Sequence, residues 1–387
     1  MGWFIGLMSG TSLDGVDAVL AWHGPDSPLP SMSNTHSAPP GRQVPQAAHH
    51  LHLPMPADLR AELLALNRSG DDEIHRAALA ANALVKLYAE AVGRLLQPSG
   101  LQAQDIEAIG AHGQTVRHRP GEFDGTGYTV QLMNGALLAE TCGIDVVCDF
   151  RSRDVAAGGQ GAPLVPAFHA ACFAEPGRDV AVLNLGGIAN LSLLGADGSV
   201  GGFDTGPGNV LMDLWCQRHL KQPFDADGAW AAGGTVEESL LQRWLDSEPY
   251  FHLMPPKSSG RDLFNIEWLD SRLAGTDAAP RDLMATLLEL TARNVVQHLL
   301  QHAPRTTDLL VCGGGANNVR LMARLHHLLG AGVRVSCTAV DGLPPDQVEA
   351  MAFAWLAAAN LARVTGNHPA VTGAKGPRVL GSLYPAQ

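Results

Sequence analysis

The sequence predicts an α/β protein of two lobes, each a mixed β-sheet flanked by helices, with a cleft between the lobes. Its 387 residues exceed what one ordinary core holds, so two domains of about 150 to 200 residues each are expected. A strand, a small polar turn and a returning strand occur near the N-terminus and again over 180–193, which indicates two copies of one topology. We expect the first lobe over 1–150, completed by 366–387, and the second over 151–365.

The composition excludes several classes of protein. Charged residues make up only 17% while 43 Gly and 25 Pro are present, which is typical of an enzyme with many tight loops. The net charge of −12 argues against nucleic acid or an anionic membrane as a partner, because both need a basic surface. Six cysteines without a CxxC pair indicate reduced thiols, and no apolar run has the length of a signal peptide or a membrane span. We therefore expect a cytoplasmic protein.

The first two predicted strands, 4–8 and 16–22, are joined by a turn of small polar residues from Ser9 to Gly15. Backbone NH and hydroxyl donors in such a turn suit a phosphate, and Asp14 or Asp17 can hold a metal ion through water. The turn differs from the Walker motif because it lacks GKS or GKT and joins two strands. The alternative is an ordinary polar turn, which is the commoner use of these residues.

The next part of the chain, residues 24–96, is expected to have a structural role only. Residues 24–50 are rich in Pro, Ser and His and predict an exposed excursion with at most a weak third strand. Residues 57–66 and 73–96 predict helices, the second of them long and amphipathic. None of these segments contributes a candidate functional residue.

Polar side chains follow a short buried strand predicted over 106–111. His112 and Gln114 stand directly after it. In open α/β sheets the ligand lies at the carboxyl ends of strands, so this position favours contact with a substrate. A structural histidine is the alternative.

A further strand, 144–148, runs into two arginines, Arg151 and Arg153, and then into a Gly-rich loop over 158–166. An arginine offers a rigid fork for a carboxylate or phosphate, so we expect at least one of the two to meet an anionic ligand. The alternative is a surface cluster of ion pairs with the neighbouring aspartates.

The second strand–turn–strand unit begins at Val180 and carries Asn184, Gly186 and Gly187 in or beside its turn. Because the turn resembles the first one, the two could hold a phosphate chain from both sides. A nearby hairpin then ends its second strand, 199–203, in Asp204 and turns through glycines into a helix from Asn209, whose side chain we expect to cap it. The bare backbone around Asp204 allows a ligand to approach closely, although a capping Asp in a Gly-rich turn is an equal alternative.

The rest of the chain predicts helices over 230–245 and 282–302, separated by a basic loop, 255–262, to which no role is assigned. An apolar strand, 309–312, then opens into three glycines and a helix over 319–329. Glycines at a helix N-terminus favour the phosphates of a nucleotide, but the absence of GxGxxG argues against a dinucleotide.

The last predicted helix begins at Pro344 and Pro345 and places Glu349 in its first turn. An acid at this place is favoured by the helix dipole. That structural explanation is the simplest one for Glu349 on its own.

Taken together, these motifs resemble the anhydro-N-acetylmuramic acid kinase family of the actin, Hsp70 and hexokinase superfamily. The segments that carry the resemblance extend from the first strand to the last quarter of the chain: GLMSGTSLDGVD at 6–17, AHGQT at 111–115, DFR at 149–151, GGQGAPLVP at 158–166, NLGGIAN at 184–190, FDTGPGN at 203–209 and CGGGANN at 312–318. Each is weak alone, but the combination is specific. A departure is the segment 24–50, which does not resemble a regular third strand.

The resemblance implies a two-lobed actin/Hsp70/hexokinase-like fold and an ATP- and Mg²⁺-dependent enzyme. Such an enzyme opens the internal bridge of 1,6-anhydro-N-acetylmuramic acid with water and phosphorylates the freed 6-oxygen, giving N-acetylmuramate 6-phosphate in peptidoglycan recycling. It implies a catalytic base at Asp204 and a phosphate loop over 10–17.

The implied site residues fall into three groups. The nucleotide would contact Gly10, Thr11, Ser12, Leu13, Asp14, Gly15, Val16, Asp17, Asn184, Gly186, Gly187, Gly313, Gly314, Gly315 and Asn318, with Asp14 and Asp17 as candidate metal ligands. The amino sugar would contact His112, Gln114, Arg151, Gln160, Pro163 and Glu349, with Arg151 pairing the lactyl carboxylate and Glu349 touching the anhydro ring. A homodimer is expected, with apolar helices such as 282–302 as candidates for its interface.

Other functions stay open at this point. A nucleotide-switched binding protein of the chaperone or actin type would hydrolyse ATP without stimulation by a sugar. A chaperone would also need a peptide-binding domain, for which no residues remain. A kinase for another sugar, or a phosphatase, would share the same loops.

Overall fold

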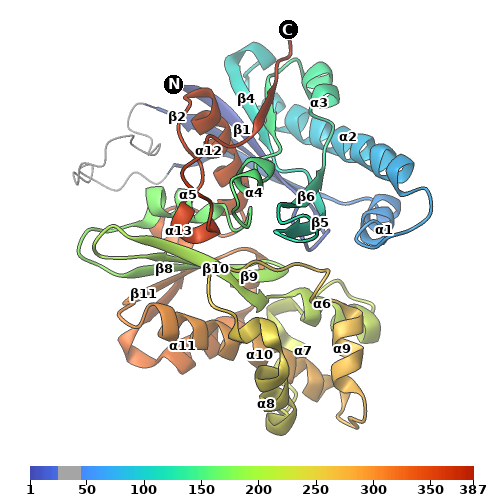
Figure 1. Cartoon of the computed structure of the whole chain (residues 1–387), viewed down its shortest axis with the longest axis vertical. Coiled ribbons are helices and arrows are strands. Elements are labelled where there is room, and N and C mark those ends of the chain that lie inside the picture. The colour runs from blue at the N-terminus through green and yellow to red at the C-terminus, as the bar shows by residue number, and fades with distance from the viewer. Residues whose placement is uncertain (25–44) are drawn as a thin grey trace.

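The computed structural model describes residues 1–24 and 45–387. Over these residues the chain forms a six-stranded sheet, a five-stranded sheet and a small two-stranded sheet. Figure 1 shows the six-stranded sheet in the upper half of the molecule and the five-stranded sheet below it. The predicted fold class, sheets flanked by helices, is confirmed.

The first sheet has the strand order β13-β7-β4-β1-β2-β3. Its strands are β13 (Ser382–Tyr384), β7 (Val146–Cys148), β4 (Ile106–Ala111), β1 (Gly2–Met8), β2 (Gly15–His23) and β3 (Ala47–Pro54). β1 pairs antiparallel with β2 and parallel with β4, so the predicted N-terminal hairpin is confirmed and the end of β4 lies beside the hairpin turn.

The segment predicted as an exposed excursion, 24–50, divides in the structure. Residues 25–44 lie outside the described residues. From Ala47 the chain forms β3, which pairs antiparallel with β2 over the length of the strand. The third strand is therefore longer than the Pro- and His-rich sequence predicted, since backbone pairing with β2 holds it irrespective of its composition.

The second sheet has the order β10-β9-β8-β11-β12. Its strands are β10 (Val200–Pro207), β9 (Ile188–Leu194), β8 (Val180–Leu185), β11 (Asp308–Cys312) and β12 (Arg334–Cys337). The predicted hairpins β8–β9 and β9–β10 are confirmed, and β8 pairs parallel with β11. The small sheet, β5 (Gln114–Pro120) with β6 (Gly127–Leu132), was not predicted.

The helices cover both sheets. On the side of the first sheet they are α1 (Ala57–Ala65), α2 (Glu73–Ser99), α3 (Gly135–Cys142), α4 (Ser152–Ala156) and α12 (Val348–Leu361). Between the sheets, α5 (Val165–Phe173) and α13 (Pro369–Thr372) contact strands of the second sheet. On the far side of the second sheet they are α6 (Val210–Leu220), α7 (Ala229–Ala232), α8 (Glu238–Ser247), α9 (Ile266–Leu273), α10 (Pro280–His302) and α11 (Val319–Leu329). Short 3₁₀ turns are η1 (Ala103–Asp105), η2 (Ala226–Gly228), η3 (Pro249–His252), η4 (Gly314–Asn317), η5 (Gly330–Gly332) and η6 (Thr338–Asp341).

One predicted helix is interrupted. Residues 230–245 form α7 and α8 instead of a single helix, with a break after Gly233 and Gly234. A Cβ at Gly234 would lie 2.3 Å from the carbonyl oxygen of Arg281 in α10. The close packing of α10 against this turn explains why the chain breaks there.

Three cores make a layered molecule (Figure 1). One lies between the first sheet and α1, α2 and α3, and another between the second sheet and the helices α6 to α11. The third lies between the two sheets, where α12 packs against β1, β2 and β4 of the first sheet and α5 packs against β8, β9 and β10 of the second. Among the described residues no helix is both long and apolar enough to cross a membrane.

Helix α12 lies unusually close to the first sheet at two glycines. A Cβ at Gly6 would lie 1.9 Å from the carbonyl oxygen of Ala350, and one at Gly110 would lie 2.0 Å from that of Phe353. Neither oxygen can move without displacing the helix. The two glycines therefore set the distance between α12, which carries Glu349, and the strands that carry the phosphate loop.

We expect Gly110→Ala to destabilise the protein by about 3 kcal/mol, because the added methyl group must push α12 away from β4. Gly93→Ala is the matched control, since no atom lies within 4 Å of its added Cβ in α2. That change should stabilise the protein by roughly 0.5–1 kcal/mol. Urea unfolding of both variants measures the difference, and equal midpoints would contradict the close approach of α12.

Two features bear on the predicted lobes. β13 joins the first sheet beside β7, where the C-terminal return over 366–387 was expected. α12 belongs to the range 151–365 by sequence, yet it packs against β1, β2 and β4 of the first sheet. The division at 150 and 365 remains a proposal, in which α12 would be counted with the first lobe.

Candidate active site

A cavity of about 560 Å³ opens between the two sheets. This volume is typical of a site for a small ligand. Most of the sequence-predicted site residues line it: Gly10, Thr11, Ser12, Leu13, Asp14, Asp17, His112, Gln114, Arg151, Pro163, Asn184, Gly186, Gly187, Asp204, Gly313, Gly314, Gly315, Asn318 and Glu349. Gly10 and Glu349, which are more than 300 residues apart in the chain, thus line the same space.

Three of the predicted residues do not line the cavity. Gly15 and Val16 belong to β2 and are buried, and a Cβ at Gly15 would lie 2.3 Å from the carbonyl oxygen of Leu53. Gln160 is turned toward the loop 255–262, where its Oε1 accepts a hydrogen bond of 3.1 Å from Ser258 Oγ. Their part in ligand binding would be indirect.

Asp204 owes its position to an irregularity in β10. The pairing with β9 shifts between Asp204, which faces Asn190, and Gly206, which faces Ala189. Such a bulge turns a side chain away from the regular alternation of the strand. The Asp204 carbonyl accepts a hydrogen bond of 2.8 Å from Tyr250 Oη, which fixes the backbone. The carboxylate is 5% exposed and lines the cavity, as the sequence predicted.

The surroundings of Asp204 shift the pKa of its carboxyl group. Burial raises the pKa of this carboxyl to about 7, while the backbone NH of Ser259 and the charges of Arg151 and Lys257 act in the opposite direction. The Ser259 NH donates to Oδ2 at 2.9 Å. Among the described residues no other hydrogen bond reaches the carboxylate, so Oδ1 is left for a ligand. A carboxyl that titrates near neutral pH suits a general base.

The loop 255–262, to which the sequence assigned no role, supplies most of what surrounds Asp204. Ser259 and Arg261 line the cavity and Lys257 is buried behind it. The Arg261 guanidinium donates to the carbonyl of Thr11, so this loop also reaches the phosphate hairpin. Only its two basic and two serine side chains among glycine and proline hinted at an anion site, which is a weak signal.

Arg151 and His112 form a pair at the edge of the cavity. Arg151 Nη1 donates to the carbonyl of Gly161 at 2.8 Å, and its Nε donates to His112 Nε2 at 3.2 Å. His112 Nδ1 lies 2.7 Å from the carbonyl of Gly113. Burial, followed by the charge of Arg151, lowers the pKa of His112 to about 3, so the ring is neutral and donates through Nδ1. His112 thus holds the guanidinium in place.

The turn of the first hairpin is held from two sides. Gln114 Nε2 donates to the carbonyl of Gly10 at 3.1 Å, and Ser12 Oγ donates to Asp14 Oδ1 at 2.5 Å. Leu13 has a φ of 56°, a left-handed conformation that is costly for this residue. The contacts therefore hold the turn in a strained shape, with its backbone facing the cavity.

The two hairpin turns meet at Thr11 and Gly187. A Cβ at Gly187 would lie 2.5 Å from Thr11 Oγ1, whereas one at Gly186 would meet nothing closer than 3.5 Å. The turns lie on the same cavity, as expected for a pair that grips a phosphate chain.

We expect Gly187→Ala to lower kcat/KM by about 10²-fold, because the methyl group would push the two turns apart, and a misplacement of about 1 Å at a reacting group costs a factor of that size. Gly186→Ala should change it by less than about threefold, since the added Cβ makes ordinary contacts there. Steady-state kinetics of the pair measure this difference. Equal losses in both variants would contradict a role for the contact with Thr11.

The glycines after β11 form the far side of the cavity. A Cβ at Gly313 would lie 2.4 Å from Asn184 Oδ1, while Gly314 faces open space. Asn318 Oδ1 accepts from the NH of Leu321 at 3.0 Å and caps α11. Asn209 does not cap α6 as predicted, because its Nδ2 donates instead to the Leu185 carbonyl at 2.9 Å.

Three carboxylates face each other across the cavity, and their charges repel. Burial, together with the charges of Asp17 and Asp14, raises the pKa of Glu349 to about 7, while a hydrogen bond with Asn184 and the charge of Arg151 act in the opposite direction. Burial also raises the pKa of Asp17, but the hydrogen bonds and charges of His50 and His52 outweigh it and hold that pKa below its usual value. His52 Nδ1 lies 2.9 Å from Asp17 Oδ1. A cation between these groups would relieve the repulsion.

Across residues 1–24 and 45–387 no cluster of three or more metal-ligating side chains occurs. A magnesium ion usually takes only one or two carboxylates and completes its shell with water and phosphate oxygens. Asp14 and Asp17 fit that pattern, and the sequence left open which of them approaches the ion. Asn184 Oδ1 is buried without a hydrogen-bond partner, which fits a donor from a bound ligand.

Five acids that line the cavity were not predicted as site residues: Asp213, Asp225, Asp227, Asp262 and Asp346. Asp213, in the first turn of α6, lines the cavity close to Arg261. Burial raises its pKa to about 7, and the charge of Arg261 works against this rise. A lone acid in an amphipathic helix gives no signal of this position, since it arises only when the loop 255–262 folds over it.

Comparisons with known proteins relate the whole chain to one family. Residues 2–386 match the family model described as "Anhydro-N-acetylmuramic acid kinase". A protein of that name from Variovorax paradoxus is 56% identical over 99% of this chain and 99% of its own length. One from Bordetella petrii is 57% identical over 99% of this chain and 96% of its own. A solved structure, the activator of 2-hydroxyisocaproyl-CoA dehydratase from Clostridium difficile with bound ADPNP, aligns at a TM-score of 0.45 with 11% identity, covering 93% of this chain and 96% of that one.

Proposed function

Since this chain belongs to the anhydro-N-acetylmuramic acid kinase family, we infer that it is an ATP-dependent sugar kinase. Its substrate is 1,6-anhydro-N-acetylmuramic acid, whose internal bridge it opens with water and whose 6-oxygen it phosphorylates. The product is N-acetylmuramate 6-phosphate. The observation that carries the assignment of roles is a buried carboxylate, Asp204, in a cavity bounded by two donor-lined turns.

We propose that Asp204 is the general base. Its free Oδ1 takes a proton from water as the water oxygen forms a bond to the anomeric carbon of the sugar. The bond between that carbon and the bridging 6-oxygen breaks, and the released oxygen is then placed to form its bond to the γ-phosphoryl group while ADP leaves. The raised pKa of Asp204 supports this role, because the carboxylate is basic enough to accept a proton near neutral pH.

The phosphoryl transfer itself needs alignment and charge neutralisation more than a covalent nucleophile. The NH groups of the turn at Gly10 and of the loop at Gly314 would hold phosphates, since neither position carries a side chain in the way. Asp14 and Asp17 would hold Mg²⁺, which neutralises the charge of the phosphates when it is bound. Arg261 would add a positive charge from the second sheet's side of the cavity.

The sugar would lie between Asp204 and the pair of Arg151 and His112. A guanidinium held by a neutral histidine can offer two parallel NH groups to the lactyl carboxylate. Glu349 and Pro163 face the same space and would contact the ring. These contacts support a substrate that combines an anhydro ring with an acid.

The test is the dependence of ATP turnover on the sugar. Purified protein with ATP and Mg²⁺ should release ADP and form a sugar phosphate when the anhydro sugar is present, and should prefer it strongly to N-acetylmuramic acid with the bridge already opened. ATP hydrolysis that no sugar stimulates would favour a nucleotide-switched binding protein. Equal turnover of both sugars, or turnover of another sugar alone, would indicate a kinase with a different substrate.

The rate should depend on pH through Asp204. Below its pKa of about 7 the carboxyl holds a proton and cannot accept another, so kcat should fall about tenfold per pH unit on the acid side and level off above pH 7 to 8. Burial sets this position, since an exposed Asp would titrate near 4. Kinetics from pH 5 to 9 at saturating substrates measure it, and a constant kcat down to pH 5 would contradict a base with this pKa.

Two further expectations remain proposals. A cytoplasmic location follows from the reaction, since ATP is made there. A homodimer is also proposed, but helix α10 gives it little support, because most of its apolar residues are buried in the core between the second sheet and α6 to α11 and only Leu300 among its large apolar side chains is exposed. Light scattering of the purified protein would determine the oligomeric state.

A further inference from the structure

Behind Asp204 lies a lysine that the mechanism above does not use. Lys257 is 3% exposed, and burying an ammonium group is costly unless the charge serves a purpose or is paired. Its Nζ donates to the carbonyl of Tyr250 at 3.1 Å and to His298 Nε2 at 2.8 Å. Both acceptors are uncharged. The lysine is thus held in place without the carboxylate partner that buried lysines usually have.

The histidine fixes which group carries the proton. His298 Nδ1 lies 2.8 Å from the carbonyl of Asn294, one turn earlier in α10, so this nitrogen must be the donor. Nε2 is then an acceptor, and Lys257 must donate to it. Burial, followed by the charge of Lys257, lowers the pKa of His298 to about 4, which keeps the ring neutral. Burial lowers the pKa of Lys257 to about 8, and Asp204 opposes this change, so the ammonium stays charged at pH 7.

Lys257 is connected to Asp204 through the backbone on both sides. The Asp204 NH donates to the Lys257 carbonyl at 3.3 Å, and two residues later the Ser259 NH donates to Asp204 Oδ2. The ammonium also lies 4.7 Å from the ring centre of Tyr250, whose hydroxyl bonds the Asp204 carbonyl, and 5.7 Å from that of Phe203. The aromatic faces attract the cation and fix it beside the strand that carries Asp204.

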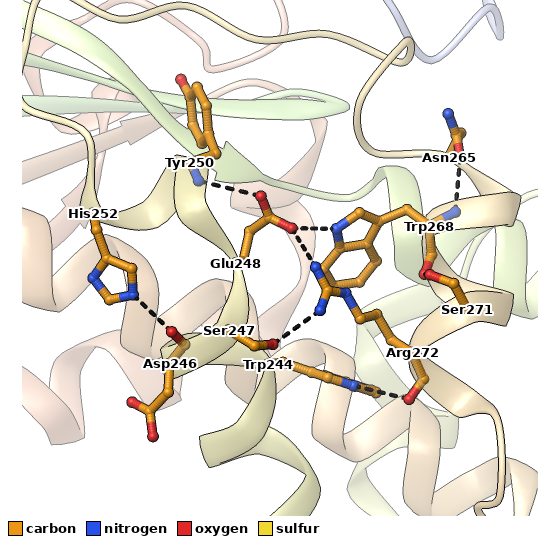
Figure 2. Close-up of polar contacts among 10 residues, drawn as sticks. All are labelled: Trp244, Asp246, Ser247, Glu248, Tyr250, His252, Asn265, Trp268, Ser271 and Arg272. Carbon is orange, nitrogen blue, oxygen red and sulfur yellow. Dashed lines mark hydrogen bonds and ion pairs between the residues drawn. The ribbon is translucent and has the colours of Figure 1, made fainter.

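The segment that precedes Lys257 is held by contacts outside the cavity. Figure 2 shows Glu248 at its centre, with Oε1 accepting from the NH of Tyr250 at 3.2 Å and Oε2 accepting from Trp268 Nε1 at 2.7 Å. Arg272 Nη2 donates to the same Oε2 at 2.9 Å. Glu248 therefore holds η3, from which the chain leads to Lys257. The charge of Glu248 is paired with Arg272 and not with Lys257.

We propose that Lys257 is a positioning residue for Asp204: a buried cation, fixed by His298 and Tyr250, that keeps the base ionised while its free oxygen stays open to water. A lysine bonded directly to the carboxylate would also keep it charged, but it would occupy the oxygen that must accept the proton. Placing the cation behind the strand avoids this conflict. The proposal rests on the proposed role of Asp204.

Few other charges act on the pair. The titratable and charged groups that face Asp204 are Arg151, Lys257 and Tyr250, and those that face Lys257 are Asp204, Tyr250, His298 and His302. Burial lowers the pKa of His302, and the charge of Lys257 lowers it further, so this ring is neutral where the enzyme works. Two cations act on Asp204, and Arg151 is assigned to the sugar. Lys257 is the other one, and its contacts are with the segments that hold Asp204.

The test uses the pH dependence of kcat in Lys257→Gln, which keeps donors for both acceptors but has no charge. Without the cation the ionised form of Asp204 is less favoured, so its pKa rises and the acid limb of the profile should move up by about one pH unit. At pH 6 kcat should fall about tenfold relative to wild type, and at pH 9 the two should converge. Lys86→Met, at an exposed position in α2, is the control and should leave the profile unchanged.

Lys257→Met is a second variant, in case the amide packs poorly. Thermal unfolding shows whether each variant is folded, and ATP binding shows whether its cavity is intact. A loss of kcat that is the same at every pH would overturn the proposal, because it would indicate a purely structural lysine. So would an unchanged profile. If the wild-type protein does not phosphorylate the anhydro sugar, the proposed function is wrong. That result is seen without the variant, so it is distinct from a failure of the role proposed for Lys257.

Discussion

Replacing Asp204 with Asn should reduce kcat by about 10³-fold and leave ATP binding nearly unchanged. Asn has the same shape and can still accept the hydrogen bond from the Ser259 NH through its amide oxygen. It cannot take a proton from water, so only the base is removed, and removing a general base typically costs 10²- to 10⁴-fold. Single-turnover kinetics measure the chemical step, and calorimetric titration measures the dissociation constant of ATP.

Asp246→Asn is the matched control for this change. Asp246 lies at the exposed end of α8, and its replacement should leave kcat within about twofold of wild type. A rate close to wild type in Asp204→Asn would show that another group accepts the proton. A large loss of ATP binding in the same variant would show instead that the carboxylate shapes the nucleotide site.

Replacing Arg151 with Lys should raise the KM for the anhydro sugar by roughly 30- to 100-fold, which corresponds to the loss of about 2–3 kcal/mol of charge-assisted hydrogen bonding. Lysine keeps the positive charge near Asp204, so the base is little affected, but it cannot present two parallel NH groups. The KM for ATP should not change. Initial rates with each substrate varied in turn measure both constants.

A sugar without the lactyl group shows whether Arg151 recognises the lactyl carboxylate or only supports the loop around it. Wild type should strongly prefer 1,6-anhydro-N-acetylmuramic acid to 1,6-anhydro-N-acetylglucosamine, and Arg151→Lys should lose most of that preference. Arg153→Lys is the control, because Arg153 is exposed and does not line the cavity. If Arg151→Lys lost activity equally with both sugars, the arginine would serve mainly to hold His112 and the Gly161 carbonyl.

The sequence was most informative where local pattern decides the structure. The hairpins around Gly10 and Gly187 and the helix after Asn318 were predicted because alternation, glycine turns and helix caps act between near neighbours. The position of Asp204 in the cleft was predicted, but the strand was expected to end at this residue, whereas β10 continues through a bulge to Pro207. The resemblance to a known family then related these separate loops to one reaction.

Long-range contacts could not be predicted in the same way. Arg261 meets Thr11 across 250 positions of the chain, and Lys257 meets His298 only because the loop 255–262 folds back onto α10. Nothing in the local sequence around Lys257 distinguishes it from a surface lysine. Likewise the placement of α12 depends on two glycines in other elements, Gly6 and Gly110, and not on the helix itself.

The most direct test of the account is a reaction in water labelled with ¹⁸O. If Asp204 activates water to attack the anomeric carbon, early product should carry one ¹⁸O on the hydroxyl of that carbon and none on the 6-oxygen or the phosphate. Mass spectrometry of the product before the reducing end exchanges with solvent would show this. Label in the phosphate, or an unlabelled sugar, would contradict the role given to Asp204.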